Sequence, residues 1–185
     1  MNSKLFTIKH DDSPDIHPRT DCENLGTMAC WHKRYTLGDI QPKEDSNDWV
    51  FKNVPKGSIV LPVYMYDHSG LTINTTGFSQ VDSARWDWGQ LGIIFCTPDR
   101  IKKEYSIKRI TKATREKVRK VLIQEIETYD KHLRGAVWGY VYEGPEGYDS
   151  CWGFIGDTLE ETGIREACPA YITDSLIEHA WENRA

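Results

Sequence analysis

The chain has 185 residues, of which 39% are hydrophobic and 28% charged, a composition typical of an ordinary globular protein. No run of about 18 apolar residues exists, so the sequence predicts no membrane-spanning helix. The N-terminal apolar stretch is also too short for a signal peptide, and five widely spread cysteines favour reduced thiols over a disulfide framework. We therefore expect one cytoplasmic domain over residues 1–185, in which about two-thirds of the unfolded surface becomes buried.

Three strands are predicted in the first hundred residues. Residues 4–9 alternate, residues 59–66 are largely β-branched or aromatic and end in a turn, and residues 90–97 form a continuous apolar run. Residues 71–89, rich in Thr, Ser and Gly, predict a short strand and then a long loop. Earlier in the chain we expect a short helix or an ordered loop at 21–39, followed by a polar insertion that is anchored by Trp49.

The second half of the chain predicts more helix. Thr97 and Pro98 offer a cap and a first helical residue for a short basic helix. Residues 111–133 place apolar residues at three- and four-residue spacing, which predicts a long amphipathic helix. A strand at 136–144 and a last helix at 170–181 complete the pattern. Because no βαβ regularity is present, we expect an α+β fold: a small mixed or antiparallel sheet, the long helix and the C-terminal helix.

Six strings in the sequence are specific in combination. They are DCENLGTMACWHKRYTLGD, YMYDHSGLTI, WDWGQLGIIF, IKKEYSIKRI, EIETYDKHLRGAVWGY and DSCWGFIGD, and with their flanks they cover nearly all of residues 4–157. In these strings the chain resembles a family of small accessory proteins encoded by phages and other mobile elements of bacteria. The resemblance implies a protein that acts on a host defence system, for example as an anti-CRISPR-like factor.

The run Ser150-Cys151-Trp152-Gly153-Phe154 resembles the Ser-Cys-Trp-Ala-Phe run around the nucleophile of papain-like proteases. A cysteine nucleophile needs a lowered pKa and a histidine within hydrogen-bond reach. Only His179 follows Cys151, and the preceding stretch lacks the glutamine that those proteases use. We therefore expect Cys151 to be a small buried residue beside Trp152 and Phe154, which pack into the core.

The stretch Asp67-His68-Ser69-Gly70 predicts a turn at a strand end. Neighbours on a strand point to opposite faces and rarely form a relay, but ionisable residues at strand ends often line sites. Two enzyme hypotheses therefore use His68. One is a permuted cysteine hydrolase in which His68 serves Cys151, assisted by Asp67 or Gln90. The other is a metal-free ribonuclease that uses His68 or His32 with a nearby lysine or arginine.

Cys22, Cys30 and His32 are three soft metal ligands, and His10 or His17 offers a fourth. Structural zinc sites pair ligands two to four residues apart. Here the two cysteines are more widely spaced and no second close pair follows. We therefore expect packing thiols, no metal and no cofactor.

Positive charge concentrates between residues 100 and 120. This segment carries Arg100, Lys102, Lys103, Lys108, Arg109, Lys112, Arg115, Lys117, Arg119 and Lys120. It holds only two acidic residues, Glu104 and Glu116, in a chain whose net charge is −5. Cations at the start of a helix oppose its dipole, a disadvantage that phosphate or an acidic partner would offset. The alternative is a solvated face whose charges pair with carboxylates elsewhere.

Trp86 and Trp88 stand two residues apart in a polar loop, and Phe78 and Trp31 join them as candidate contact residues. Loop aromatics serve as interface anchors or base-stacking platforms, or they cover the core. Taken with the basic segment, they favour a protein that acts by binding rather than catalysis. Its partner would be a host protein or ribonucleoprotein, such as a defence complex, with RNA as a further partner. An enzyme is the second hypothesis and a structural or virion protein the third.

Overall fold

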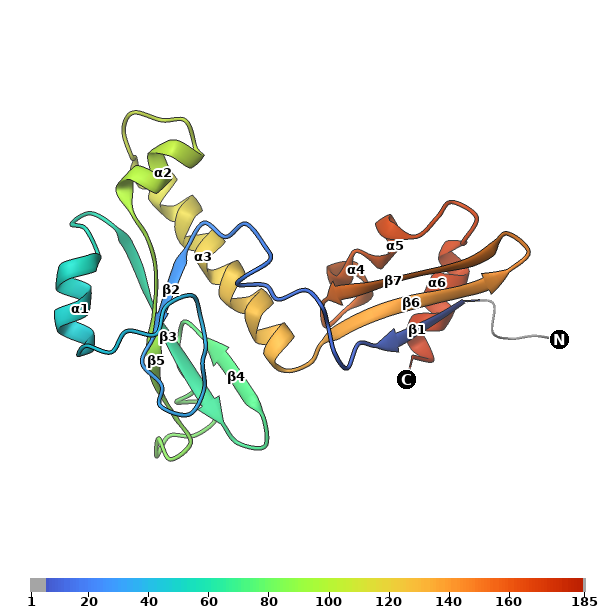
Figure 1. The fold of residues 1–185 in the computed structure, drawn as a ribbon, viewed down its shortest axis with the longest axis horizontal. Helices are drawn as coiled ribbons and strands as arrows, with labels where there is room; N and C mark the ends of the chain where they lie inside the picture. The colour runs from blue at the N-terminus through green and yellow to red at the C-terminus, as the bar shows by residue number, and fades with distance from the viewer. Residues whose placement is uncertain (1–5, 185) are drawn as a thin grey trace. The chain divides into compact units, whose positions relative to one another are not determined.

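The computed structural model describes residues 6–184, which divide into two compact units (Figure 1). Residues 18–130 form the central unit, and residues 6–17 with 131–184 form the terminal unit. Each unit combines one antiparallel sheet with helices, which confirms the predicted α+β class. That residues 1–185 form a single domain stays a prediction.

The central unit is built on a four-stranded antiparallel sheet of order β2-β5-β3-β4. Its strands are β2 (Thr27–Cys30), β3 (Ile59–Asp67), β4 (Leu71–Asn74) and β5 (Trp88–Cys96). The predicted runs correspond to β3 and β5, and the predicted short strand is β4. However, β2 lies where the sequence predicted a short helix or an ordered loop, because it is a strand only through its pairing with β5.

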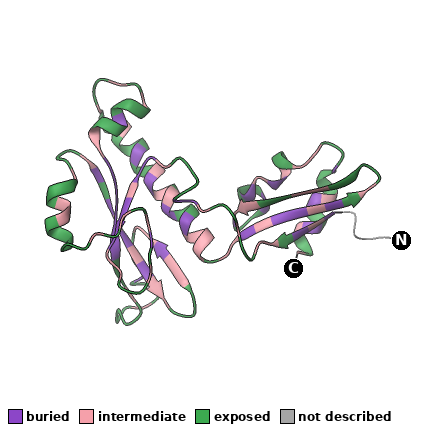
Figure 2. Cartoon of the chain, viewed as in Figure 1, coloured by how far each residue is buried: buried purple, intermediate pink, exposed green. Residues whose placement is uncertain are grey.

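Two helices cover opposite faces of this sheet. On one face, α3 (Lys112–Leu133) buries Val118, Leu122, Ile126 and Tyr129, which confirms its amphipathic stripe. On the other, Trp49 and Val50 of α1 (Ser46–Asn53) pack against Ile93 and Phe95. The predicted anchor Trp49 therefore sits on a short helix within the polar insertion. Figure 2 shows buried segments along the sheet and α3, whereas α1 is mostly exposed.

The short basic helix α2 (Pro98–Glu104) follows β5 directly. The Thr97 hydroxyl accepts a hydrogen bond from the Arg100 amide at 3.3 Å, and Pro98 occupies the first turn, as the sequence predicted. Ile101 is fully buried and fixes the helix to the unit. The charged residues of α2 are thereby held on the surface.

The terminal unit has a three-stranded antiparallel sheet of order β1-β6-β7. Its elements are β1 (Phe6–His10), β6 (Val137–Gly144), β7 (Gly147–Ile155), α4 (Leu159–Thr162), α5 (Ile164–Ala167) and α6 (Asp174–Glu182). The helices pack on one core with Ile8, Tyr140 and Ile177. The strand predicted at 4–9 begins outside the described residues, and the last helix starts four residues later than the predicted 170–181.

Within residues 6–184, no helix combines the length and apolarity that crossing a lipid bilayer requires.

Candidate functional site

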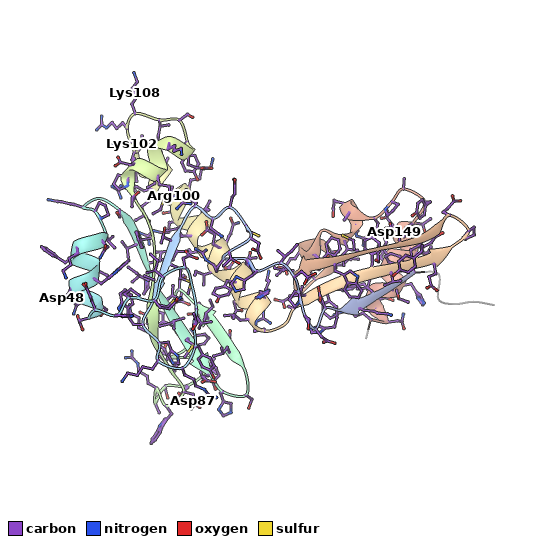
Figure 3. All side chains as sticks on the ribbon, viewed as in Figure 1. Asp48, Asp87, Arg100, Lys102, Lys108 and Asp149 are labelled. Atoms are coloured by element: carbon purple, nitrogen blue, oxygen red, sulfur yellow. The ribbon has the colours of Figure 1, made fainter. Side chains whose placement is uncertain are left out.

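The structure places the ten predicted cations on one continuous segment, α2, the loop after it and the first half of α3. We call them the basic surface: Arg100, Lys102, Lys103, Lys108, Arg109, Lys112, Arg115, Lys117, Arg119 and Lys120. All ten are exposed. Figure 3 labels Arg100, Lys102 and Lys108, which lie at one end of the central unit. The first turn of α3 contains no acidic residue to balance the cations there.

The carboxylates of the chain leave most of this charge unpaired. Of the ten cations, Lys102 alone forms a salt bridge within the described residues, to Asp99 at 3.8 Å. Arg115 donates instead to the backbone carbonyl of Gly57 at 3.1 Å, and Arg100 to that of Asn24. The Lys117 ammonium lies 4.7 Å from the ring centre of Tyr105. The positive potential of the segment is therefore not cancelled locally.

A second feature of the central unit is a cavity of about 380 Å³ beside Trp86, which we call the Trp86 pocket. It is lined by His32, Met65, Asp67, Trp86, Asp87, Trp88, Gly89, Gln90 and Leu91. The lining comes from the end of β3, the loop that leads into β5, the first residues of β5 and the segment that follows β2. Sheet pairing thus brings together residues that the sequence analysis had selected for separate reasons.

The two predicted loop tryptophans differ in environment. Trp86 is 85% exposed, whereas Trp88 is half-buried and its indole N–H donates to the Asp82 carbonyl at 2.6 Å. Trp88 also packs edge-on against Phe78, which is itself buried. Trp86 is therefore a free contact residue, while Trp88 mainly supports the loop. Trp31 packs against Trp49 on α1.

Both predicted strand-end residues, Asp67 and His68, have polar partners. The His68 Nδ1 lies 3.0 Å from Asp87 Oδ2, and the Asp67 carboxylate accepts from the Tyr35 hydroxyl at 3.0 Å. A carboxylate only accepts hydrogen bonds, so the proton of a neutral His68 sits on Nδ1 and its Nε2 is the acceptor. His68 does not pair with its neighbour Asp67 in a relay, consistent with their adjacent positions in the sequence.

His32 has the opposite tautomer. Its Nδ1 accepts from the backbone amides of Arg34 and Tyr35, at 3.3 and 3.1 Å. The proton of the neutral ring therefore sits on Nε2, which is a hydrogen-bond donor. The ring also stacks on Tyr35 with centres 5.1 Å apart. The hydrogen bonds at Nδ1 and this stacking contact together fix the orientation of the ring.

The basic surface and the Trp86 pocket lie at opposite ends of the central unit. Figure 3 shows Asp87 at one end and Lys108 at the other. The strand β5, which begins at Trp88 and ends at Cys96, runs between the two ends and spans about 27 Å. A partner that contacts both features must therefore cover this distance.

Cys151 is not a buried packing residue, so that prediction was wrong. Cys151 is exposed and Trp152 is 43% exposed, although Phe154 does pack against the terminal core. The reason is that β7 is an edge strand, and Trp152 lies across Gly139 on the face away from the core. Cys151 belongs to the terminal unit and His68 to the central unit. Their pairing in a cysteine hydrolase stays a prediction.

The three soft ligands do not share one environment. Cys22 is exposed, whereas Cys30 is buried, and this burial raises the pKa of its thiol to about 12. His32 uses its Nδ1 for backbone amides. Among residues 6–184, no group of three or more His, Cys, Asp or Glu side chains is arranged to hold a metal ion.

The sequence analysis missed a buried charge network in the central unit. The Arg19 side chain is 1% exposed and contacts the carboxylates of Asp39 and Glu125. Glu125 also accepts from the Leu25 amide at 2.6 Å. A cavity of about 820 Å³ adjoins it, lined in part by Arg100 of the basic surface. The Arg19 nitrogens donate to Asp39, Glu125 and the Gly26 carbonyl, so the network holds the loop before β2 against α3. No spacing in the sequence signals it.

No family model, no curated protein and no solved structure matches this chain.

Proposed function

We propose that this protein acts by binding, and that its basic surface docks on the phosphate backbone of RNA in a host ribonucleoprotein. One observation carries the proposal: ten exposed cations lie on α2, the loop after it and the first half of α3, and within the described residues only Lys102 has a carboxylate partner. If the protein's own carboxylates neutralised these cations, more of the ten would form ion pairs. Phosphates would also relieve the charge repulsion at the start of α3.

The test removes three cations from one side of α3. Lys112, Arg115 and Arg119 are exposed and follow an i, i+3, i+7 spacing, so they share a face. The variant Lys112→Ala, Arg115→Ala, Arg119→Ala is compared with a control that loses the same charge elsewhere, Lys9→Ala, Lys33→Ala, Lys43→Ala. All three control lysines are exposed and lie outside the basic surface.

Binding to a fluorescein-labelled single-stranded RNA is measured by anisotropy over a series of salt concentrations. Each lost phosphate contact lowers the log–log salt slope by about 0.7 for a single strand. The triple variant should therefore bind more weakly than the control and show a slope reduced by about 2. If both variants bind as wild type does at every salt concentration, the basic surface is only solvated charge.

The resemblance to mobile-element accessory proteins supports a defence ribonucleoprotein as the host partner. The corresponding test expresses the protein in bacteria that carry an RNA-guided defence system and challenges them with a targeted phage. Wild-type protein should restore phage growth, and the basic-surface variant should not. Restoration by the variant alone, or by neither protein, argues against this partner.

A metal-free ribonuclease is a second candidate function, favoured by the His68–Asp87 pair beside a pocket that His32 lines. In such a reaction His68 Nε2 takes the proton of a ribose 2′-hydroxyl, whose oxygen attacks the adjacent phosphorus. The 5′-oxygen leaves with a proton from solvent, and a 2′,3′-cyclic phosphate remains. Cleavage in a chelator that is lost in His68→Ala would support it, and intact RNA after long incubation would reject it.

A further inference from the structure

The Trp86 pocket has the size and composition of a small-molecule site. Its volume of about 380 Å³ lies in the range that protein ligand sites occupy. One wall is an exposed indole, and the others carry two carboxylates and an imidazole. A flat, apolar face next to a few fixed polar atoms suits a planar heteroaromatic ring.

The indole of Trp86 is presented on a fixed backbone. The Asp82 carboxylate accepts hydrogen bonds from the amides of Trp86 and Asp87, at 2.7 and 3.1 Å, and from that of Ala84 at 3.0 Å. These backbone contacts hold the pKa of Asp82 below its usual range. An 85% exposed tryptophan on an ordered loop is a ready stacking surface.

The polar atoms around the pocket define a hydrogen-bond pattern. Asp67 uses Oδ2 for Tyr35, and Asp87 uses Oδ2 for His68. In the described part of the chain, the Oδ1 atoms of Asp67 and Asp87 have no hydrogen-bond donor, so each remains an acceptor. The backbone of Asp67 donates to the Asp87 carbonyl at 2.9 Å, which keeps the two residues side by side. His32 adds an N–H donor at Nε2.

We propose that the Trp86 pocket binds a guanine base. Guanine is the one common nucleobase whose Watson–Crick edge carries two adjacent donors, N1–H and N2–H₂, and the free carboxylate oxygens of Asp67 and Asp87 accept from them. The neighbouring O6 accepts from His32 Nε2–H, and the ring stacks on Trp86. Adenine and cytosine would set a ring-nitrogen acceptor against a carboxylate, and uracil has a single ring donor between two carbonyls.

Guanine binding is a property beyond the proposed docking on RNA phosphates. The basic surface lies at the far end of the central unit from Asp87, and guanosine has no phosphate for it to bind. Guanosine binding therefore tests the pocket alone. Loss of RNA binding in the basic-surface variant tests the other site alone, so either result can fail without the other.

The experiment follows tryptophan fluorescence during titration with guanosine, inosine, adenosine, cytidine and uridine. Guanosine should quench it saturably. Inosine lacks the N2 amino group, so we expect about tenfold weaker binding or more, because a hydrogen bond to a charged acceptor is lost. Since the chain has 7 tryptophans, Trp86→Phe identifies the signal: it retains a stacking ring but should lose the quenching.

Two substitutions of equal size separate the pocket from general charge effects. Asp67→Asn and Asp87→Asn each replace one of the two carboxylate oxygens by an NH₂ group, which donates and does not accept. Each should weaken guanosine binding about tenfold or more. The control is Asp48→Asn, an exposed aspartate on α1 that lies outside the pocket. It should bind as wild type does. Unchanged melting temperatures establish that the variants are folded.

Titration with an oligoribonucleotide that contains one guanine, and with its inosine counterpart, distinguishes RNA from a free nucleoside as the source of the base. Preference for guanine in either arm supports the site. Three results overturn it: no saturable quenching in both arms, equal affinities for the guanine and inosine forms, or an equal loss in Asp48→Asn and Asp87→Asn.

Discussion

The guanidinium of Arg19 lies 3.0 Å from the carboxylate of Glu125, with only 1% of the arginine side chain and 11% of the glutamate side chain exposed. This contact fixes the loop after residue 17 to the middle of α3. The arginine also donates to the Asp39 carboxylate and to the Gly26 carbonyl. The loop that leads into β2 is thus held by charge and hydrogen bonds as well as by apolar packing.

Replacing this arginine should destabilise the central unit strongly. Arg19→Met retains most of the side-chain volume but leaves two carboxylates without their cation. Breaking a buried pair in this way costs about 3–5 kcal/mol. Urea denaturation followed by circular dichroism measures the loss. Arg165→Met is the control, because Arg165 pairs with Asp174 and Glu178 near the surface and should lose much less. Equal losses would contradict a special role for Arg19.

A close backbone approach makes Gly92 irreplaceable in β5. A Cβ built at Gly92 would lie 2.1 Å from the carbonyl oxygen of Ala29, across the β2–β5 ladder. Gly92→Ala should therefore force the strands apart and lower the free energy of unfolding by about 1–3 kcal/mol or more. Gly89→Ala on the same strand is the matched control, since nothing lies within 4 Å of its Cβ position. A control variant as unstable as Gly92→Ala would show that the cause is glycine loss in general.

His10 should titrate above its ordinary range. Hydrogen bonding to the Asp12 carboxylate, together with the Gly135 carbonyl on the other ring nitrogen, raises the pKa of His10 from 6.5. A raised pKa stabilises the folded state below pH 6.5, and this contribution is lost as the pH rises through the folded-state pKa. NMR titration of the ring protons measures it. Asp12→Asn should lower the pKa of His10, whereas Asp15→Asn should leave it nearly unchanged. An unshifted titration in wild type would refute the contact.

The five cysteines should separate into two classes on alkylation. Cys22 and Cys151 are exposed, and we expect them to react with iodoacetamide in the folded protein. Burial raises the pKa of Cys30 to about 12 and those of Cys96 and Cys168 to about 11, so these thiols should react only after unfolding. Mass spectrometry of peptides from timed reactions measures each site. Early modification of Cys30 would contradict its burial.

The sequence predicted those elements whose own residues determine their conformation. The apolar runs of β3 and β5 and the apolar stripe of α3 can be recognised in the sequence without any knowledge of tertiary contacts. By contrast, the four residues of β2 become a strand only beside β5, and the glycines and aspartate of β7 give little strand preference. The eight-residue α1 has no buried residue to create a period.

The same distinction applies to the candidate sites. The basic surface is contiguous in the chain and was predicted from charge alone. In the Trp86 pocket, the residues Asp67 and Asp87 come together through the register of β3 and β5, which contains a bulge after Val63 that no sequence pattern reveals. The tautomers of His32 and His68 likewise depend on contacts that only the folded chain makes.

The division of the chain has a consequence for the order of folding during synthesis on the ribosome. The central unit is continuous, so all of its strands and nearly all of α3 emerge before residue 131. The terminal unit is discontinuous, because β1 pairs with β6 across more than a hundred residues, with Phe6 opposite Tyr142. The first strand to be translated must therefore remain without its sheet partner until most of the protein has been made, while the segment inserted behind it can already fold.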